Sequence, residues 1–146
     1  MDDQFAVQMG NPASRAVIFH RWDVWKRFIS VWLEGKPETA EEKLRVLDAG
    51  CGDGINLRGL SAILEDLGGP FRLYGMDYNV VRARRAKNLV EEVLVGDLLR
   101  PPLKKEIFDI ILCNQVLEHI PDDLDALKAL RDILAPGGVL ILGVPN

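Results

Sequence analysis

Residues 47–54 read Leu-Asp-Ala-Gly-Cys-Gly-Asp-Gly and continue an apolar run that starts at Leu44. This pattern predicts a buried strand that runs into a glycine-rich turn. Glycine has no Cβ, adopts positive φ at little cost and lets a ligand approach the main chain closely. The three alternating glycines, Gly50, Gly52 and Gly54, therefore indicate a place where a nucleotide-like ligand lies against bare backbone. A tight strand-to-helix turn that binds nothing is the alternative interpretation.

The composition narrows the class of protein. The chain has 146 residues, of which 48% are hydrophobic and 27% charged, as expected for one soluble globular domain. The formal net charge of −4 argues against a generally basic nucleic-acid surface. No apolar run is long enough for a membrane span, and the acidic N-terminus does not resemble a signal peptide.

The cysteine and histidine residues are few and widely spaced. Cys51 and Cys113 are the only cysteines, and the chain has two histidines. None of the four has the close spacing of zinc ligands, so no metal site is expected. A reducing cytoplasm is the simplest location for such a chain. We interpret the two thiols as small apolar side chains near the ligand.

Helical and strand patterns alternate along the chain after an aromatic-rich N-terminal segment. Residues 1–43 are expected to form a helical cap with a helix over 14–33, and residues 44–146 a ligand-binding core within one domain. Further helices are predicted over 55–67, 79–89 and 122–134, and strands over 45–49, 71–76, 93–95, 108–113 and 139–144. Such alternation favours an α/β fold, a doubly wound, Rossmann-like parallel sheet with helices on both faces.

Carboxylates follow two of the predicted strands. Asp77 ends the second strand, where it can accept two hydrogen bonds from the vicinal hydroxyls of a ribose. Its alternative role is to cap the helix that begins near Asn79. Asp97 ends the third strand, where it can accept a hydrogen bond from an adenine amine while the Leu98 N–H reaches a ring nitrogen. Its alternative role is that of an ordinary turn residue.

The glycine spacing separates two classes of ligand. Dinucleotide-binding enzymes favour G-x-G-x-x-G, whereas this chain has G-x-G-x-G followed by Ile55. Asp48 and Asp53 place negative charge beside the turn, where a pyrophosphate needs positive potential. A ligand with a ribose, an adenine, a cationic sulfur and an ammonium group meets no such repulsion.

Five stretches together resemble the class I S-adenosylmethionine-dependent methyltransferases. They are residues 48–54, Asp77, Asp97, residues 108–119 and residues 134–138. The chain is most similar to the small-molecule branch that includes the ubiquinone-biosynthesis O-methyltransferases, and the resemblance covers about residues 44–146. It implies a strand order of 3-2-1-4-5, S-adenosyl-L-methionine as cofactor and methyl transfer to a small-molecule acceptor.

The resemblance also implies a role for individual residues. Gly50 and Gly52 would lie along the methionine and ribose parts of the cofactor, and Asp48 would reach its ammonium through water. The backbone carbonyl of Asn114 would accept from the same ammonium. The full set of implied cofactor-binding residues is Asp48, Gly50, Cys51, Gly52, Asp77, Tyr78, Asp97, Leu98, Asn114, Gln115 and Val116.

Other residues have two interpretations each. His119 is the candidate general base for a substrate hydroxyl, and a helix-start residue is its alternative. The tryptophans of the N-terminal helix, at positions 22, 25 and 32, are either packed surface or a lid over the methyl donor. The basic residues between Arg82 and Lys87 are interpreted as a solvated helix face.

Two further functional hypotheses remain. A protein or nucleic-acid methyltransferase is one, although residues 114–117 read Asn-Gln-Val-Leu rather than the Asn/Asp-Pro-Pro-Tyr run of amino-methylating DNA enzymes. A cofactor-binding fragment that needs a partner chain is the other, since the resembled fold continues past its fifth strand and this chain is expected to be truncated there. Residues 139–144 would then form a bare apolar edge strand, through which we expect self-association.

Overall fold

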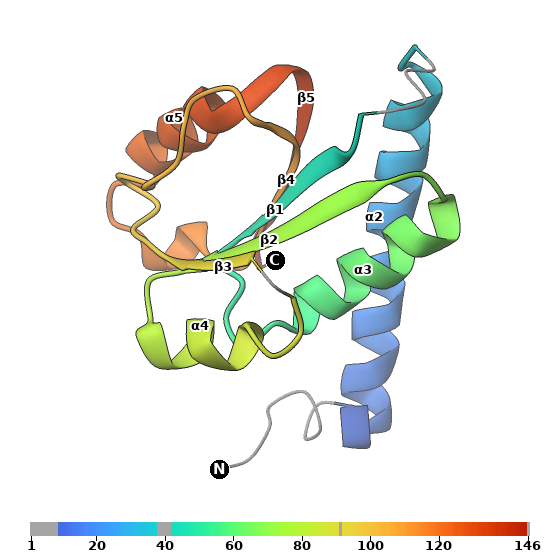
Figure 1. The fold of residues 1–146 in the computed structure, drawn as a ribbon. Coiled ribbons are helices and arrows are strands. Elements are labelled where there is room, and N and C mark those ends of the chain that lie inside the picture. Colours follow the sequence, from blue (N-terminus) through green and yellow to red (C-terminus); the bar gives the residue numbers. More distant parts are fainter. Residues whose placement is uncertain (1–8, 38–41, 91, 146) are drawn as a thin grey trace.

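The computed structural model describes residues 9–37, 42–90 and 92–145. Figure 1 shows a central sheet with helices on both of its faces. In chain order the elements are α2 (Pro12–Glu34), β1 (Leu44–Ala49), α3 (Ile55–Leu67), β2 (Phe71–Asp77), α4 (Val80–Ala86), β3 (Glu92–Val95), β4 (Phe108–Asn114), the short 3₁₀ helix η1 (Leu117–His119), α5 (Asp123–Ile133) and β5 (Leu134–Gly143).

The five strands are parallel and lie in the order β3-β2-β1-β4-β5. This order confirms the predicted doubly wound, Rossmann-like fold. The chain order reverses between β1 and β4, so the loops after these strands diverge and leave a crevice at the carboxyl edge of the sheet. The glycine-rich turn follows β1, directly at that point.

Each face of the sheet has its own apolar core because parallel strands are covered on both sides. The first core packs α2, α3 and α4 on one face and includes Trp25, Val46 and Leu60. The second packs α5 and the link between β3 and β4 on the other face and includes Leu47, Phe108 and Leu130. Figure 1 shows α5 separated by the sheet from α2, α3 and α4.

The N-terminal helix α2 is part of the core layer. Asn11 caps it by accepting from the Ala13 N–H at 2.9 Å, and Gly35 ends it, close to the predicted bounds. Trp25 is buried, and Trp22 lies so close to Gly59 of α3 that a Cβ there would overlap its ring. The tryptophans therefore attach α2 to the molecule, and the lid interpretation is wrong for them.

The end of α5 differs from the prediction. The helix stops at Ile133 and β5 begins at Leu134, whereas the sequence predicted a strand only from residue 139. The N–H groups of Glu106 and Ile107 donate to the last carbonyls of α5, so the chain already pairs with the start of β4 there. Residues 135–138 then bulge out, because Phe108 pairs with Leu134 and Ile110 already pairs with Val139.

The helix α4 is shorter than predicted and ends at Ala86 instead of Leu89. The chain turns there, with the Leu89 N–H donating to the Ala86 carbonyl at 2.9 Å. This turn brings the Leu89 side chain against Gly54, where a Cβ would lie 2.5 Å from Leu89 Cδ1. Within the described residues, no helix is long and apolar enough to cross a membrane.

Candidate active site

The turn after β1 is held by backbone hydrogen bonds to β2. The N–H groups of Gly50 and Cys51 donate to the Met76 carbonyl at 2.7 and 2.9 Å. Gly50 has φ 86°, and a Cβ at this position would overlap the side chain of Val116. Both the backbone conformation and the close approach of Val116 thus require glycine here.

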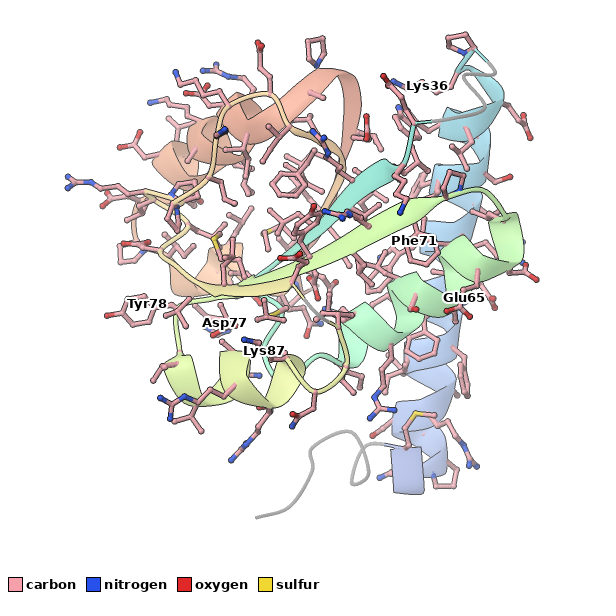
Figure 2. All side chains as sticks on the ribbon, in the orientation of Figure 1. Lys36, Glu65, Phe71, Asp77, Tyr78 and Lys87 are labelled. Carbon is pink, nitrogen blue, oxygen red and sulfur yellow. The ribbon has the colours of Figure 1, made fainter. Side chains whose placement is uncertain are left out.

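Asp77 connects the glycine turn to the start of α4. Its Oδ2 accepts from the Gly52 N–H and its Oδ1 from the Asn79 N–H, both at 2.8 Å. Asn79 is the residue that caps α4, so the helix-cap role considered for Asp77 is wrong. Each carboxylate oxygen of Asp77 keeps a second acceptor position, which suits the two vicinal hydroxyls of a ribose. Figure 2 shows Asp77 and Tyr78 together at the carboxyl end of β2.

Asp53 is paired with the basic residues of α4. Its Oδ1 lies 3.3 Å from Arg85 Nη1, and its Oδ2 lies 3.7 Å from Arg82 Nε. The side chains of the two arginines remain partly exposed, as the interpretation of a solvated helix face predicts, but they also pair with Asp53. The pairing also neutralises much of the Asp53 charge, so Asp53 repels a pyrophosphate less than the sequence suggested.

Asp48 lies on β1 directly before the glycine turn and is fully buried. Neither of its oxygens has a hydrogen-bond partner among the described residues. Burial, with a smaller contribution from the like charge of Asp77, raises the pKa of Asp48 to about 8. An unpaired carboxylate in such surroundings holds its proton at neutral pH.

Asp97 and Leu98 follow β3. Asp97 is exposed, and its Oδ1 accepts from the Leu99 N–H at 2.9 Å, which is the geometry of a side-chain-closed turn. Its Oδ2 remains available for an adenine amine. Tyr78, at the end of β2, is 80% exposed and lines a cavity at the carboxyl edge of the sheet.

The chain turns sharply after β4. Gln115 has φ 55°, which is unusual for a residue with a Cβ, and its N–H donates to the Gly143 carbonyl at 2.6 Å. This bond fixes the turn against β5. Asn114 is buried beside Gly143, where a Cβ would overlap the Asn114 amide, so the two strand ends approach closely.

His119 lies in η1 with 78% of its side chain exposed, and its Nε2 is 3.9 Å from Glu118 Oε1. It borders the same cavity from this exposed position. Both cysteines are buried as free thiols, and burial raises the pKa of Cys51 strongly and that of Cys113 to about 12. They are therefore protonated and unreactive, as expected of small apolar side chains.

These residues surround one cavity of about 510 Å³ at the carboxyl edge of the sheet. Every predicted cofactor residue except Asp48 lines it, and so does His119. Sequence reasoning missed several further lining residues, among them Ile18, Arg21 and Arg82. Arg21 belongs to α2, and no pattern in the sequence indicates that this helix reaches the strand ends. No group of three or more metal-binding side chains occurs in the described part of the chain.

Comparison with known proteins agrees with this geometry. The family model of the methyltransferase domain matches residues 19–146. The chain belongs to the S-adenosylmethionine-dependent methyltransferase family. S-adenosylmethionine is the cofactor of this family. The family match includes most of α2, so the helix that carries Arg21 is part of the family domain.

Two curated relatives and one solved structure illustrate the likeness. The ubiquinone biosynthesis O-methyltransferase of Xanthomonas campestris pv. campestris is 34% identical over 107 residues, which are 70% of this chain and 43% of that protein. A probable S-adenosylmethionine-dependent methyltransferase of Mycolicibacterium smegmatis is 31% identical over 69% of this chain and 38% of that protein. The chain therefore spans less than half the length of these relatives. The citrinin polyketide synthase CMeT domain shares the fold, with a TM-score of 0.69 and 23% identity over 97% of this chain and 41% of that one.

Proposed function

We propose that this protein transfers the methyl group of S-adenosylmethionine to a small-molecule acceptor. The observation that carries the proposal is the arrangement of Asp77, whose carboxylate binds the Gly52 N–H and still faces the cavity with two free acceptor positions. The named O-methyltransferase relatives support a small acceptor. We also propose that the described helices and strands act as one cofactor-binding unit, with the helical segment before residue 44 as its cap.

The cavity offers a complementary group for each part of the cofactor. Asp77 would bind the ribose hydroxyls, Asp97 and the Leu98 N–H the adenine, and Tyr78 would stack beside the base. Gly50, Cys51 and Gly52 would present bare main chain to the ribose and methionine, with Asn114, Gln115 and Val116 opposite. Their common position around the cavity supports these roles.

Arg21 completes the amino-acid end of the site. It lines the cavity from α2 and forms no ion pair with any residue that the structure describes. A guanidinium binds a carboxylate in a planar, two-point geometry. We therefore assign it to the carboxylate of the methionine group. Arg82 is paired with Asp53. It would therefore affect cofactor binding only indirectly, by holding the shape of the glycine turn.

Methyl transfer depends more on the alignment of the acceptor with the methyl group than on a reactive protein side chain. The sulfonium cofactor supplies an electrophilic methyl group when it is bound. The protein holds the acceptor in line with it and excludes water, which is catalysis by proximity and orientation. His119 is our candidate to take the proton from an acceptor hydroxyl, because an imidazole suits that step near neutral pH. The buried, reduced thiols also fit a cytoplasmic protein.

A direct assay tests the proposal. The chain is incubated with S-adenosylmethionine and three small acceptors: a catechol for O-methylation, a primary amine for N-methylation and a β-keto thioester for C-methylation. Mass spectrometry of the acceptors is expected to find a gain of one methyl group in at least one, and Asp77→Ala should strongly lower the rate of this transfer at subsaturating cofactor. Methyl transfer to tRNA or protein in place of all three would contradict a small-molecule acceptor. Unchanged acceptors throughout, with intact cofactor binding, would support the partner-dependent alternative.

A further inference from the structure

Asp48 is the one buried carboxylate whose oxygens both lack a partner among the described residues. It lies in the middle of the sheet, paired in register with Gly75 of β2 and Leu112 of β4. Side chains alternate along a strand, so Asp48 shares the face of Val46 and the α2–α3 core rather than that of Leu47. An ionised carboxylate in such a place would need a counter-charge.

The charged and titratable groups around Asp48 supply none in the free protein. Asp77, at the end of β2, carries the same charge and disfavours ionisation of Asp48. The thiols of Cys51, in the glycine turn, and Cys113, on β4, are near Asp48 and are neutral, because burial raises the pKa of both. Glu118 of η1 acts on Cys113, and Arg82 of α4 acts on Cys51 and pairs with Asp53. From the other packed helices, α3 contributes the neutral Asn56 and α2 contributes Arg21 at the cavity wall.

Asp48 does not line the binding cavity, but it lies close along both strands to residues that do. Gly50 follows Asp48 by two residues and lines the cavity. Asn114 of β4, two residues past the register partner of Asp48, lines it as well. This is the end of the cavity to which the methionine group is assigned. An ammonium group placed there would be the counter-charge that the free protein lacks.

We propose that Asp48 is a neutral carboxylic acid in the free protein and releases its proton to solvent when a ligand bearing an ammonium group binds above it. The inference rests on the proposed cofactor site and goes beyond it. The O–H bond of Asp48 breaks, the proton enters solvent, and the carboxylate charge pairs with the ammonium. Ligands without the ammonium leave Asp48 protonated, so the residue distinguishes amino-acid-bearing nucleosides from simple ones.

Proton release from Asp48 makes the affinity for the ligand depend on pH. Below the pKa of Asp48 in the free protein, about 8, binding must expel a proton, so affinity rises with pH. The affinity for S-adenosylhomocysteine should increase by close to a factor of about ten per pH unit between roughly pH 6 and 7. It should level off as pH approaches the free-state pKa.

Calorimetry with two ligands tests the inference. S-adenosylhomocysteine carries the ammonium and carboxylate, whereas 5′-methylthioadenosine has the same adenine and ribose without them. Titrations near neutral pH in buffers of different ionisation enthalpy should show close to one proton released per S-adenosylhomocysteine and none per methylthioadenosine. Asp48→Asn, which replaces one neutral side chain by another of the same shape, should bind without proton release and lose the pH slope. The exposed Asp125→Asn is the matched control and should behave as the wild type.

The possible results distinguish a failure of this inference from a failure of the proposed cofactor site. Binding of S-adenosylhomocysteine with no buffer dependence in the wild type would overturn the inference and leave the proposed function intact. Equal proton release in the wild type and Asp48→Asn would also overturn it, because another group would be the source. Absence of binding by both ligands would instead contradict the proposed cofactor site. The titration of the ligand itself is common to all variants and cancels in the comparison.

Discussion

At the scale of single residues, two carboxylates that look alike in the sequence have different surroundings. Asp77 accepts two backbone N–H bonds and faces the cavity, whereas Asp53 is paired with Arg82 and Arg85. Charge-assisted bonds of the first kind contribute about 1.5–3 kcal/mol each when a ligand makes them. Position in the fold, not residue type, therefore ranks the two for cofactor binding.

Replacement of Asp77 should weaken cofactor binding more than replacement of Asp53. We expect Asp77→Ala to lower the affinity for S-adenosylhomocysteine by about 2–3 kcal/mol, since it removes the ribose acceptor and frees the Gly52 N–H. Asp53→Ala should change the affinity by less than about 1 kcal/mol. Isothermal titration calorimetry measures both, with thermal unfolding as a check that each variant is folded. Equal affinities for Asp77→Ala and the wild type would reject the ribose role.

At the scale of elements, the attachment of α2 to α3 determines where Arg21 lies. The contact is close because Gly59 leaves room for the ring of Trp22, and Lys26 of α2 pairs with Asp66 of α3. Farther along α2, the Trp32 indole N–H donates to the Gly137 carbonyl of β5 at 3.0 Å. The helix is thus fixed against both α3 and the fifth strand, and its pocket residues are held in place.

Gly59→Ala tests the contact between α2 and α3. The substitution has two opposite effects on the free energy of unfolding. Alanine favours a helix over glycine by about 1 kcal/mol. The added Cβ overlaps Trp22, and overpacking of this kind costs about 1–3 kcal/mol. We expect net destabilisation in urea unfolding. In a Trp22→Ala background, the same substitution should stabilise by up to about 1 kcal/mol, and destabilisation there would show that Trp22 is not the obstacle.

At the scale of the whole molecule, Asp48 links stability to pH. Its pKa in the folded protein is about 8, against 3.8 for an ordinary aspartate, so the folded state keeps a proton that the unfolded chain has lost. Folding stability is therefore unaffected below about pH 4, falls as pH rises toward about 8 and is constant above.

The difference in unfolding free energy between Asp48→Asn and the wild type isolates this contribution. The difference should grow with pH in favour of Asp48→Asn, at a rate of at most about 1.4 kcal/mol per pH unit between roughly pH 4 and 8. Other carboxylates, including Asp132 with its lowered pKa, are common to both proteins and cancel. Urea unfolding in the absence of ligand measures the curves. Parallel curves would mean that Asp48 ionises freely in the folded state.

The edge of the sheet at β5 affects how whole molecules associate. Within the described residues β5 pairs only with β4, and Leu142 and Val144 are exposed. An edge strand with unpaired backbone N–H and C=O groups and exposed apolar side chains favours pairing with a strand of another molecule. We expect concentration-dependent association in sedimentation, weakened by Leu142→Lys. The lysine is placed at Leu142 because the neighbouring Ile141 is buried, and a charge there would disrupt the core. Equal sedimentation at all concentrations would contradict the expectation.

The strands, the glycine turn and the place of Asp77 at a strand end were predictable because each depends on local chemistry, whereas the order of the strands in the sheet was implied by the family resemblance. Continuous apolar runs identify buried parallel strands, and Gly50, Gly52 and Gly54, all with positive φ, mark the turn in any sequence. A carboxylate at a strand end must reach the common edge of a parallel sheet, whichever neighbours it has. These features need only the order of residues along the chain.

The tertiary structure alone decided which distant groups meet. Arg21 reaches the cavity because α2 packs on α3, and Arg82 neutralises Asp53 because α4 turns back beside the glycine loop. The sequence places Asp48 at the end of a strand beside the glycine turn, but only its burial between β2 and β4 raises its pKa. Ion pairing and desolvation depend on distances through space, between residues whose separation along the chain carries no such information.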